Sequence, residues 1–108
     1  MTVQQLMETC GFTAAALPQP DREVGGVYIG DLLSWVMGRA GADEAWITIM
    51  SNRNIVAVAT LADTACILLA EGVSPDEGVA QLAAEKGVNI LQSPDSAYQI
   101  AMRLRDAL

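Results

Sequence analysis

The feature that most constrains this chain is the alternation of two kinds of segment along its 108 residues. Short runs of β-branched and aliphatic residues, typical of strands, separate stretches in which apolar residues recur at helical spacing. The expected strands span residues 12–17, 25–31, 45–50, 65–72 and 88–92. The expected helices span residues 2–11, 32–41, 54–63, 74–87 and 93–108. This order predicts one α/β domain over residues 1–108, with a mostly parallel sheet of about five strands and helices on its faces.

One of these segments, NIVAVATLAD at 54–63, fits either kind of structure. Its valines and isoleucine suit a strand, whereas its alanines and the nearby Asn52 and Asn54 suit a capped helix. A helix at this point keeps the alternation with the apolar strand that follows, so we predict a helix.

Capping residues set the expected starts of three other helices. Thr2 and Gln5 stand at the spacing of a capping box, in which each side chain bonds to the backbone of the other residue. Ser74 and Glu77 predict a second box for the helix that ends at Gly87. The last helix is expected to open at 93–95, which repeats the Ser-Pro-Asp of the previous one.

Two helices have apolar faces that predict how they pack. The face of helix 32–41 comprises Leu32, Leu33, Val36, Met37 and Ala40. The face of the last helix comprises Ala97, Ile100, Ala101, Leu104 and Leu108. Trp35 lies outside the first face, and Tyr98 and Met102 lie at the margin of the second. With an apolar fraction of 52%, these three are candidates for a homodimer interface, although a half-buried surface role is the alternative for Trp35.

The charge balance argues against two classes of partner. Thirteen acidic residues against six basic ones give a net charge of −7. Nucleic acids and anionic membranes are bound through clusters of Lys and Arg, and the sequence contains no such cluster. No apolar run has the length of a membrane span, and the first ten residues lack the pattern of a signal peptide. We therefore expect a cytoplasmic protein that binds neither nucleic acid nor membrane.

The residue types needed for most catalysis are missing. The chain has no His, no phosphate-binding G-x-x-x-x-G-K-[ST] motif, and no G-x-G-x-x-G motif after a strand. Ser34 and Ser51 therefore have no imidazole to activate them. Cys10 and Cys66 lie far apart in apolar surroundings. We expect two buried free thiols, no metal, no cofactor and no enzymatic activity.

The stretch DREVGG at 21–26, followed by VYIGDLLSWVMG, WITIMSNRNIVAVATL and ILLAEG, resembles the DRTGG domain. The resemblance extends from about Val3 to Arg103, and the chain has Glu23-Val24 where the family name has a single Thr. The name-giving motif falls on Asp21, Arg22, Gly25 and Gly26. A second family block falls on GDLLS at 30–34, and a third on Asn54 with the AVA at 57–59.

The resemblance implies both a fold and a role. Domains of this family are α/β modules found at the N-terminus of HPr kinase/phosphorylase, between the CBS domains of some pyrophosphatases, and as stand-alone proteins. It therefore implies a regulatory or ligand-sensing module that often self-associates. HPr kinase keeps its kinase activity in a separate P-loop domain that this sequence lacks, so the resemblance implies no kinase activity.

The candidate ligand-binding residues are Asp21, Arg22, Gly25, Gly26, Gly30, Asp31, Ser34 and Asn54. Each has a structural alternative. Asp21 and Arg22 form either a local ion pair or an anion site in which Arg22 supplies the donors. The glycine pair at 25–26 either turns the chain into the strand or lets a ligand come close. Asp31, Ser34 and Asn54 are either helix caps or parts of a site at the carboxyl ends of the strands.

Two functions follow from these observations. The first is a regulatory domain that binds a small anionic ligand, such as a nucleotide or a phosphorylated metabolite, as a homodimer. The alternative is a protein–protein interaction module that docks onto an enzyme complex and binds no small molecule.

Overall fold

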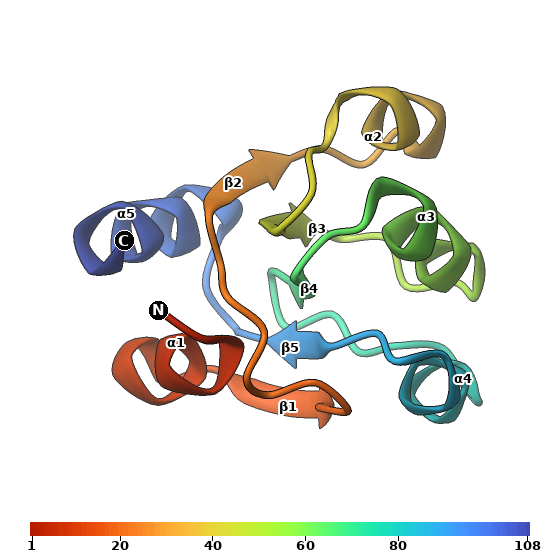
Figure 1. The fold of residues 1–108 in the computed structure, drawn as a ribbon, viewed down its shortest axis with the longest axis horizontal. Helices are drawn as coiled ribbons and strands as arrows, with labels where there is room; N and C mark the ends of the chain where they lie inside the picture. The colour runs from red at the N-terminus through yellow and green to blue at the C-terminus, as the bar shows by residue number, and fades with distance from the viewer.

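Five strands pair in the order β1-β5-β4-β3-β2 in the computed structural model, which describes all 108 residues (Figure 1). They are β1 (Thr13–Ala16), β2 (Gly26–Ile29), β3 (Glu44–Thr48), β4 (Cys66–Leu69) and β5 (Ile90–Gln92). Strands β2 to β5 run parallel, and β1 alone is antiparallel, on the outer side of β5. The predicted α/β fold with a mostly parallel five-stranded sheet is confirmed.

Helices cover both faces of this sheet. They are α1 (Val3–Cys10), α2 (Leu33–Arg39), α3 (Asn54–Ala62), α4 (Val79–Lys86) and α5 (Ala97–Ala107). Helices α1 and α5 lie on one face, and α2, α3 and α4 lie on the other (Figure 1). The ambiguous segment at 54–63 is a helix, as predicted. No helix combines the length and apolar character needed to cross a membrane.

The sheet separates two apolar cores, because its central strands are buried on both faces. Trp46 and Ile47 are neighbours on β3 and are both fully buried, but they belong to different cores. Trp46 packs in the core under α2, α3 and α4, whereas Ile47 packs in the core under α1 and α5. Cys10 and Cys66 are buried free thiols, as predicted.

The predicted caps have mixed outcomes. The Thr2–Gln5 capping box on α1 is confirmed. The prediction for α5 is wrong by three residues, because the cap is Ser96, which forms a capping box with Gln99. Ser93 is instead buried, and its hydroxyl accepts a hydrogen bond from the backbone of Asp95.

The prediction that Ser74 and Glu77 cap a helix is wrong, because α4 begins only at Val79. Residues 73–76 are held in a non-helical conformation by bonds to other parts of the chain. The Asp76 N–H donates to the Ser51 carbonyl at 2.9 Å, and the Ser51 hydroxyl donates to the Asp76 carboxylate at 2.8 Å. These long-range hydrogen bonds outweigh the local capping preference.

Helix α2 is much less buried than its apolar face predicts. Val36 is fully buried, but Leu32 is 58% exposed and Met37 is 45% exposed, because this short helix lies over the β2 edge of the sheet. Trp35 lies outside the buried face, as predicted, and the Arg39 guanidinium stacks on its ring at 3.7 Å. Leu108 was expected in the core, but it follows the end of α5 and is exposed.

Candidate functional site

The eight candidate ligand residues lie at opposite ends of the parallel strands. Gly26 begins β2, and Gly30 follows its last residue. Asp21, Arg22 and Gly25 lie with Gly26 at the end where the parallel strands begin, which we call the amino edge. Gly30, Asp31, Ser34 and Asn54 lie at the opposite end, the carboxyl edge. The fold therefore does not bring these eight residues together into one site.

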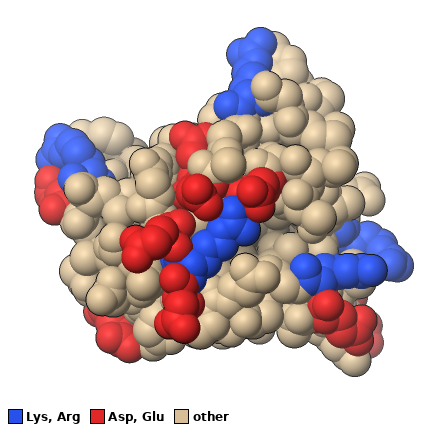
Figure 2. Space-filling view, in the orientation of Figure 1, with Lys and Arg blue, Asp and Glu red and all other residues tan.

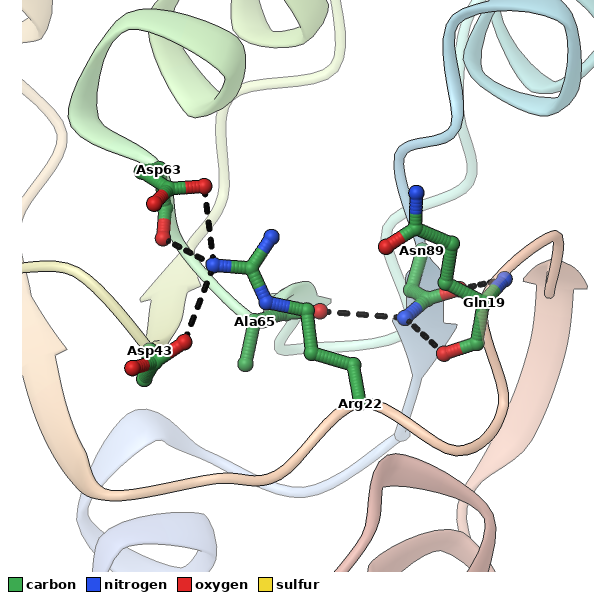
Figure 3. A network of polar contacts seen from close by, with 6 residues as sticks. All are labelled: Gln19, Arg22, Asp43, Asp63, Ala65 and Asn89. Carbon is green, nitrogen blue, oxygen red and sulfur yellow. Dashed lines mark hydrogen bonds and ion pairs between the residues drawn. The ribbon is translucent and has the colours of Figure 1, made fainter.

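Arg22 is the centre of a polar cluster at the amino edge (Figure 3). Its Nη2 donates to the Asp43 carboxylate at 3.0 Å, to the Asp63 carboxylate at 2.9 Å and to the Asp63 carbonyl at 2.6 Å. Asp43 directly precedes β3, and Asp63 is the C-cap of α3. Of the two alternatives for Asp21 and Arg22, the local ion pair is wrong, since Arg22 pairs instead with two residues distant in sequence.

The surroundings of Arg22 favour its charged form. Partial burial alone lowers the pKa of the guanidinium, but the hydrogen bonds to Asp63 and Asp43 outweigh this effect and raise its pKa. Its charge also lies at the C-terminal end of α3, where the helix dipole favours a cation. A basic side chain bordered by acidic ones is visible at the centre of the face shown in Figure 2.

Asn89 fixes the segment that carries Arg22. This buried side chain donates to the carbonyls of Gln19, at 2.8 Å, and Ala65, at 3.0 Å, and it accepts from the Gln19 N–H at 2.9 Å (Figure 3). Asn89 is not among the residues predicted from the sequence. The available signal was a polar residue inside the apolar strand segment 88–92, because a buried amide must find hydrogen-bond partners.

The glycine pair at 25–26 does not form a tight turn. Neither residue has a positive φ, and β2 begins at Gly26 itself. A Cβ on Gly26 would lie 3.2 Å from the Glu44 carboxylate, so a side chain at this position would require the Glu44 side chain to shift slightly. A Cβ on Gly30 would lie 2.9 Å from the Tyr28 ring.

The candidate residues at the carboxyl edge do not cap the helices that follow them. Asp31 does not cap α2, because its carboxylate accepts hydrogen bonds from the Thr48 hydroxyl, at 2.8 Å, and the Ile49 N–H, at 3.0 Å. Ser34 makes no capping bond. The predicted cap at Asn54 is also wrong, since Asn54 is the first residue of α3 and donates its N–H to the Asn52 side chain.

The largest cavity, of about 520 Å³, lies between α3 and α4 on the surface of the domain. Its apolar wall is formed by Val56, Ala57, Leu61 and Leu82. Its polar lining residues are Arg53, Asn54, Thr60 and Lys86. We call this cavity the α3–α4 cleft. Its volume falls within the range of pockets that hold small organic ligands.

Two basic side chains of this cleft have no partner in the protein. Arg22, Arg103 and Arg105 form ion pairs with carboxylates, and Arg39 stacks on Trp35. The two basic residues that remain of the six are Arg53 and Lys86, and both line the α3–α4 cleft. Arg53 also borders a second hollow lined by Glu77 and Glu85, but it forms an ion pair with neither. The cleft thus combines an apolar wall with two unpaired positive charges.

Of these residues of the cleft, Asn54 is among the ligand residues predicted from the sequence, whereas Arg53 and Lys86 are not. Both lie next to residues singled out as helix ends, but no sequence pattern indicates that α3 and α4 leave a cleft between them. Three or more Cys, Asp or Glu side chains do not meet anywhere to form a metal site.

The family model of the DRTGG domain matches residues 15–107. This chain belongs to the DRTGG domain family. In this DRTGG domain, Arg22, the residue assigned above to the Arg of the name-giving motif, links the loop before β2 to the segments that lead into β3 and β4 through hydrogen bonds to Asp43 and Asp63. No curated protein matches the sequence in a direct comparison.

A solved structure shares the fold of this DRTGG domain. It contains the CBS and DRTGG domains of the regulatory region of Clostridium perfringens pyrophosphatase, complexed with the activator diadenosine tetraphosphate. The match has a TM-score of 0.73 at 10% sequence identity, and it covers 99% of this chain and 47% of the other. The chain thus spans about half the length of that regulatory region, and the likeness concerns the fold.

Proposed function

We propose that this DRTGG domain is a non-catalytic regulatory module that binds a small anionic ligand, such as a nucleotide or a phosphorylated metabolite, in the α3–α4 cleft. The observation that carries the proposal is the position of Arg53 and Lys86. In a chain with a net charge of −7, the two basic side chains without a partner line the same cavity. Basic side chains also project on the right-hand side of Figure 2, where Figure 1 places α3 and α4.

The rest of the cleft fits an anion that has an apolar part. Leu61 is 71% exposed beside Arg53 and Lys86, so an apolar group seated there would be removed from water. The Asn54 amide, at the start of α3, supplies further hydrogen-bonding groups. The pyrophosphatase structure supports a regulatory role, because its DRTGG domain belongs to a regulatory region crystallised with a nucleotide activator.

The test is isothermal titration with adenosine monophosphate as the probe. Arg53→Gln and Lys86→Gln each remove a charge-assisted hydrogen bond worth about 1.5–3 kcal/mol, which corresponds to a loss of affinity of roughly tenfold or more. Arg105→Gln is the matched control, because Arg105 is exposed on the opposite layer and should leave binding unchanged. The proposal is wrong if the wild-type protein binds no phosphorylated probe, or if the first two variants bind as the wild type does.

We also propose that the domain is a homodimer that associates through the β2 edge of the sheet. Leu32, Trp35 and Met37 of the α2 region expose apolar surface there, and Ile29 at the end of β2 is 51% exposed. Tyr98 and Met102 lie on α5, on the other face of the sheet. The same apolar surface supports the alternative function, in which the module docks onto an enzyme complex.

A further inference from the structure

A second, smaller cavity adjoins the α3–α4 cleft at the amino edge of the sheet. Its volume is about 150 Å³, which equals the liquid volume of about five water molecules. Thr60 and Lys86 line both cavities, so a ligand held by Lys86 in the cleft can extend into the smaller one. The polar residues that line the smaller cavity are Gln19, Arg22, Thr60, Asp63, Thr64 and Lys86.

The hydroxyl of Thr64, which lines this cavity, has no role in holding the fold together. Its side chain is buried, with 6% of the residue exposed, and its Oγ1 has no hydrogen-bond partner. No other buried side-chain nitrogen or oxygen of the chain is without a hydrogen-bond partner. Since an unpaired buried hydroxyl lowers stability, a Val of the same shape would serve the fold better. A hydrogen bond from this hydroxyl to a bound ligand would account for a Thr at this position.

The other polar groups of the cavity indicate which chemical groups a ligand could present to it. Arg22 and Asp63 are bonded to each other, so their charges are already compensated. The Gln19 side-chain amide forms no hydrogen bond, and its Nε2 lies only 2.9 Å from where a Cβ on Gly87 would be. The Thr60 hydroxyl already donates to the Val56 carbonyl. The groups left free to donate are thus the Thr64 hydroxyl and the Gln19 side-chain amide, each also able to accept, together with the Lys86 ammonium.

We infer that this cavity is a subsite for the hydroxyl groups of a sugar, so that the ligand is a sugar phosphate or a nucleotide with its phosphate at Lys86. Sugar hydroxyls both donate and accept, which matches the free groups of Thr64 and Gln19. The inference rests on the proposed function, because the phosphate must bind in the α3–α4 cleft for the sugar to reach Thr64.

The experiment compares inorganic phosphate and ribose 5-phosphate as probes, by NMR titration of the full chain. The wild-type protein should bind ribose 5-phosphate at least tenfold more tightly than phosphate. Thr64→Val should reduce ribose 5-phosphate affinity to that of phosphate, leave phosphate binding unchanged, and raise the melting temperature. Thr64→Ser keeps the hydroxyl and should keep most of the affinity.

Thr48→Val is the matched control. The Thr48 hydroxyl is buried like that of Thr64, but it donates to Asp31, so this variant should lower the melting temperature and leave both affinities unchanged. Equal affinity of the wild type for the two probes, or full ribose 5-phosphate affinity in Thr64→Val, overturns the sugar subsite and leaves the anion site standing. Failure of both probes to bind the wild type overturns the anion site and the subsite together.

Discussion

At the scale of single residues, the Arg22 side chain makes three hydrogen bonds to residues distant in the sequence. One nitrogen of its guanidinium bonds to three acceptors, and these belong to the segments that lead into β3 and β4. Asp43 and Asp63 both adopt the left-handed conformation, which Asp tolerates better than most residues do. This geometry makes Arg22 a link between three segments, so we expect its loss to affect the stability of the fold.

Arg22→Met is expected to lower the free energy of unfolding by about 1–3 kcal/mol, because it leaves two carboxylates and a carbonyl without their shared donor. Urea unfolding followed by circular dichroism measures this difference. Arg105→Met is the matched control, since the Arg105–Asp106 pair is about 70% exposed on both sides and should contribute less than about 1 kcal/mol. Equal stability of the two variants would contradict the structural role of Arg22.

Cys66 gives a prediction about pH. Burial raises the pKa of its thiol to about 12, although the positive charge of Arg22 opposes the rise. Between about pH 9 and pH 12 the unfolded chain loses this proton and the folded chain keeps it, so stability falls as pH rises. The expected slope from this residue is about 1.4 kcal/mol per pH unit.

Urea unfolding at pH 8, 9 and 10 should therefore show a steeper loss of stability in the wild type than in Cys66→Ala. Other titrating groups affect both proteins alike, so the difference between the two curves isolates the thiol. Parallel curves would show that the Cys66 proton does not stabilise the folded state.

At the scale of the elements, the helices begin in two different ways. Helices α1 and α5 have reciprocal capping boxes, whereas α2, α3 and α4 have no side-chain hydrogen bond at the N-cap residue. The three uncapped helices follow β2, β3 and β4 at the carboxyl edge of the sheet, where the capped α5 follows β5. There the expected caps Asp31 and Ser74 instead accept hydrogen bonds from residues at strand ends, Asp31 from Thr48 of β3 and Ser74 from Gln92 of β5.

The contrast between local capping boxes and long-range hydrogen bonds explains which element boundaries can be predicted from the sequence. The strands, the helix at 54–63 and the Thr2 cap depend on local patterns and are predicted correctly from the sequence. The starts of α2 and α4 depend on bonds such as Asp31 to Thr48 and Asp76 to Ser51, which link residues 17 and 25 positions apart. Such pairings depend on how the strands lie in the assembled sheet, so local capping rules give the wrong boundary.

The caps themselves can be tested by a pair of serine variants. Ser96→Ala should lower the free energy of unfolding by about 1 kcal/mol, because it removes the acceptor for the Gln99 N–H in the first turn of α5. Ser74→Ala should change stability by less than about 0.5 kcal/mol, since Ser74 is exposed and caps no helix. Thermal unfolding of the two variants measures both effects, and the reverse order would contradict these cap assignments.

At the scale of the whole molecule, the sheet separates the candidate residues into groups that the sequence cannot reveal. Asp43 and Asp63 meet Arg22 from 21 and 41 positions away, and no short motif indicates this meeting. The cleft with Arg53 and Lys86 depends on how far α3 stands from α4, which is a property of the assembled layer. Sequence patterns therefore predict the family and the fold better than they predict the site.

The proposed homodimer is also tested at this scale. Trp35→Glu places a charge in the exposed apolar surface beside the β2 edge, where a buried charge without a partner is costly. We expect sedimentation velocity to show a dimer for the wild type and a monomer for this variant. Leu61→Glu, on exposed α3 away from that edge, should remain a dimer. A monomeric wild type would contradict the proposed interface.

One NMR titration tests the proposed anion site in the α3–α4 cleft. Adenosine monophosphate is titrated into the ¹⁵N-labelled protein, and the backbone amide shifts are followed residue by residue. We predict saturable shifts concentrated on residues 53–61 of α3 and 82–88 at the end of α4. Shifts confined to the carboxyl edge around Asp31, or no saturable shifts at all, would contradict the claim.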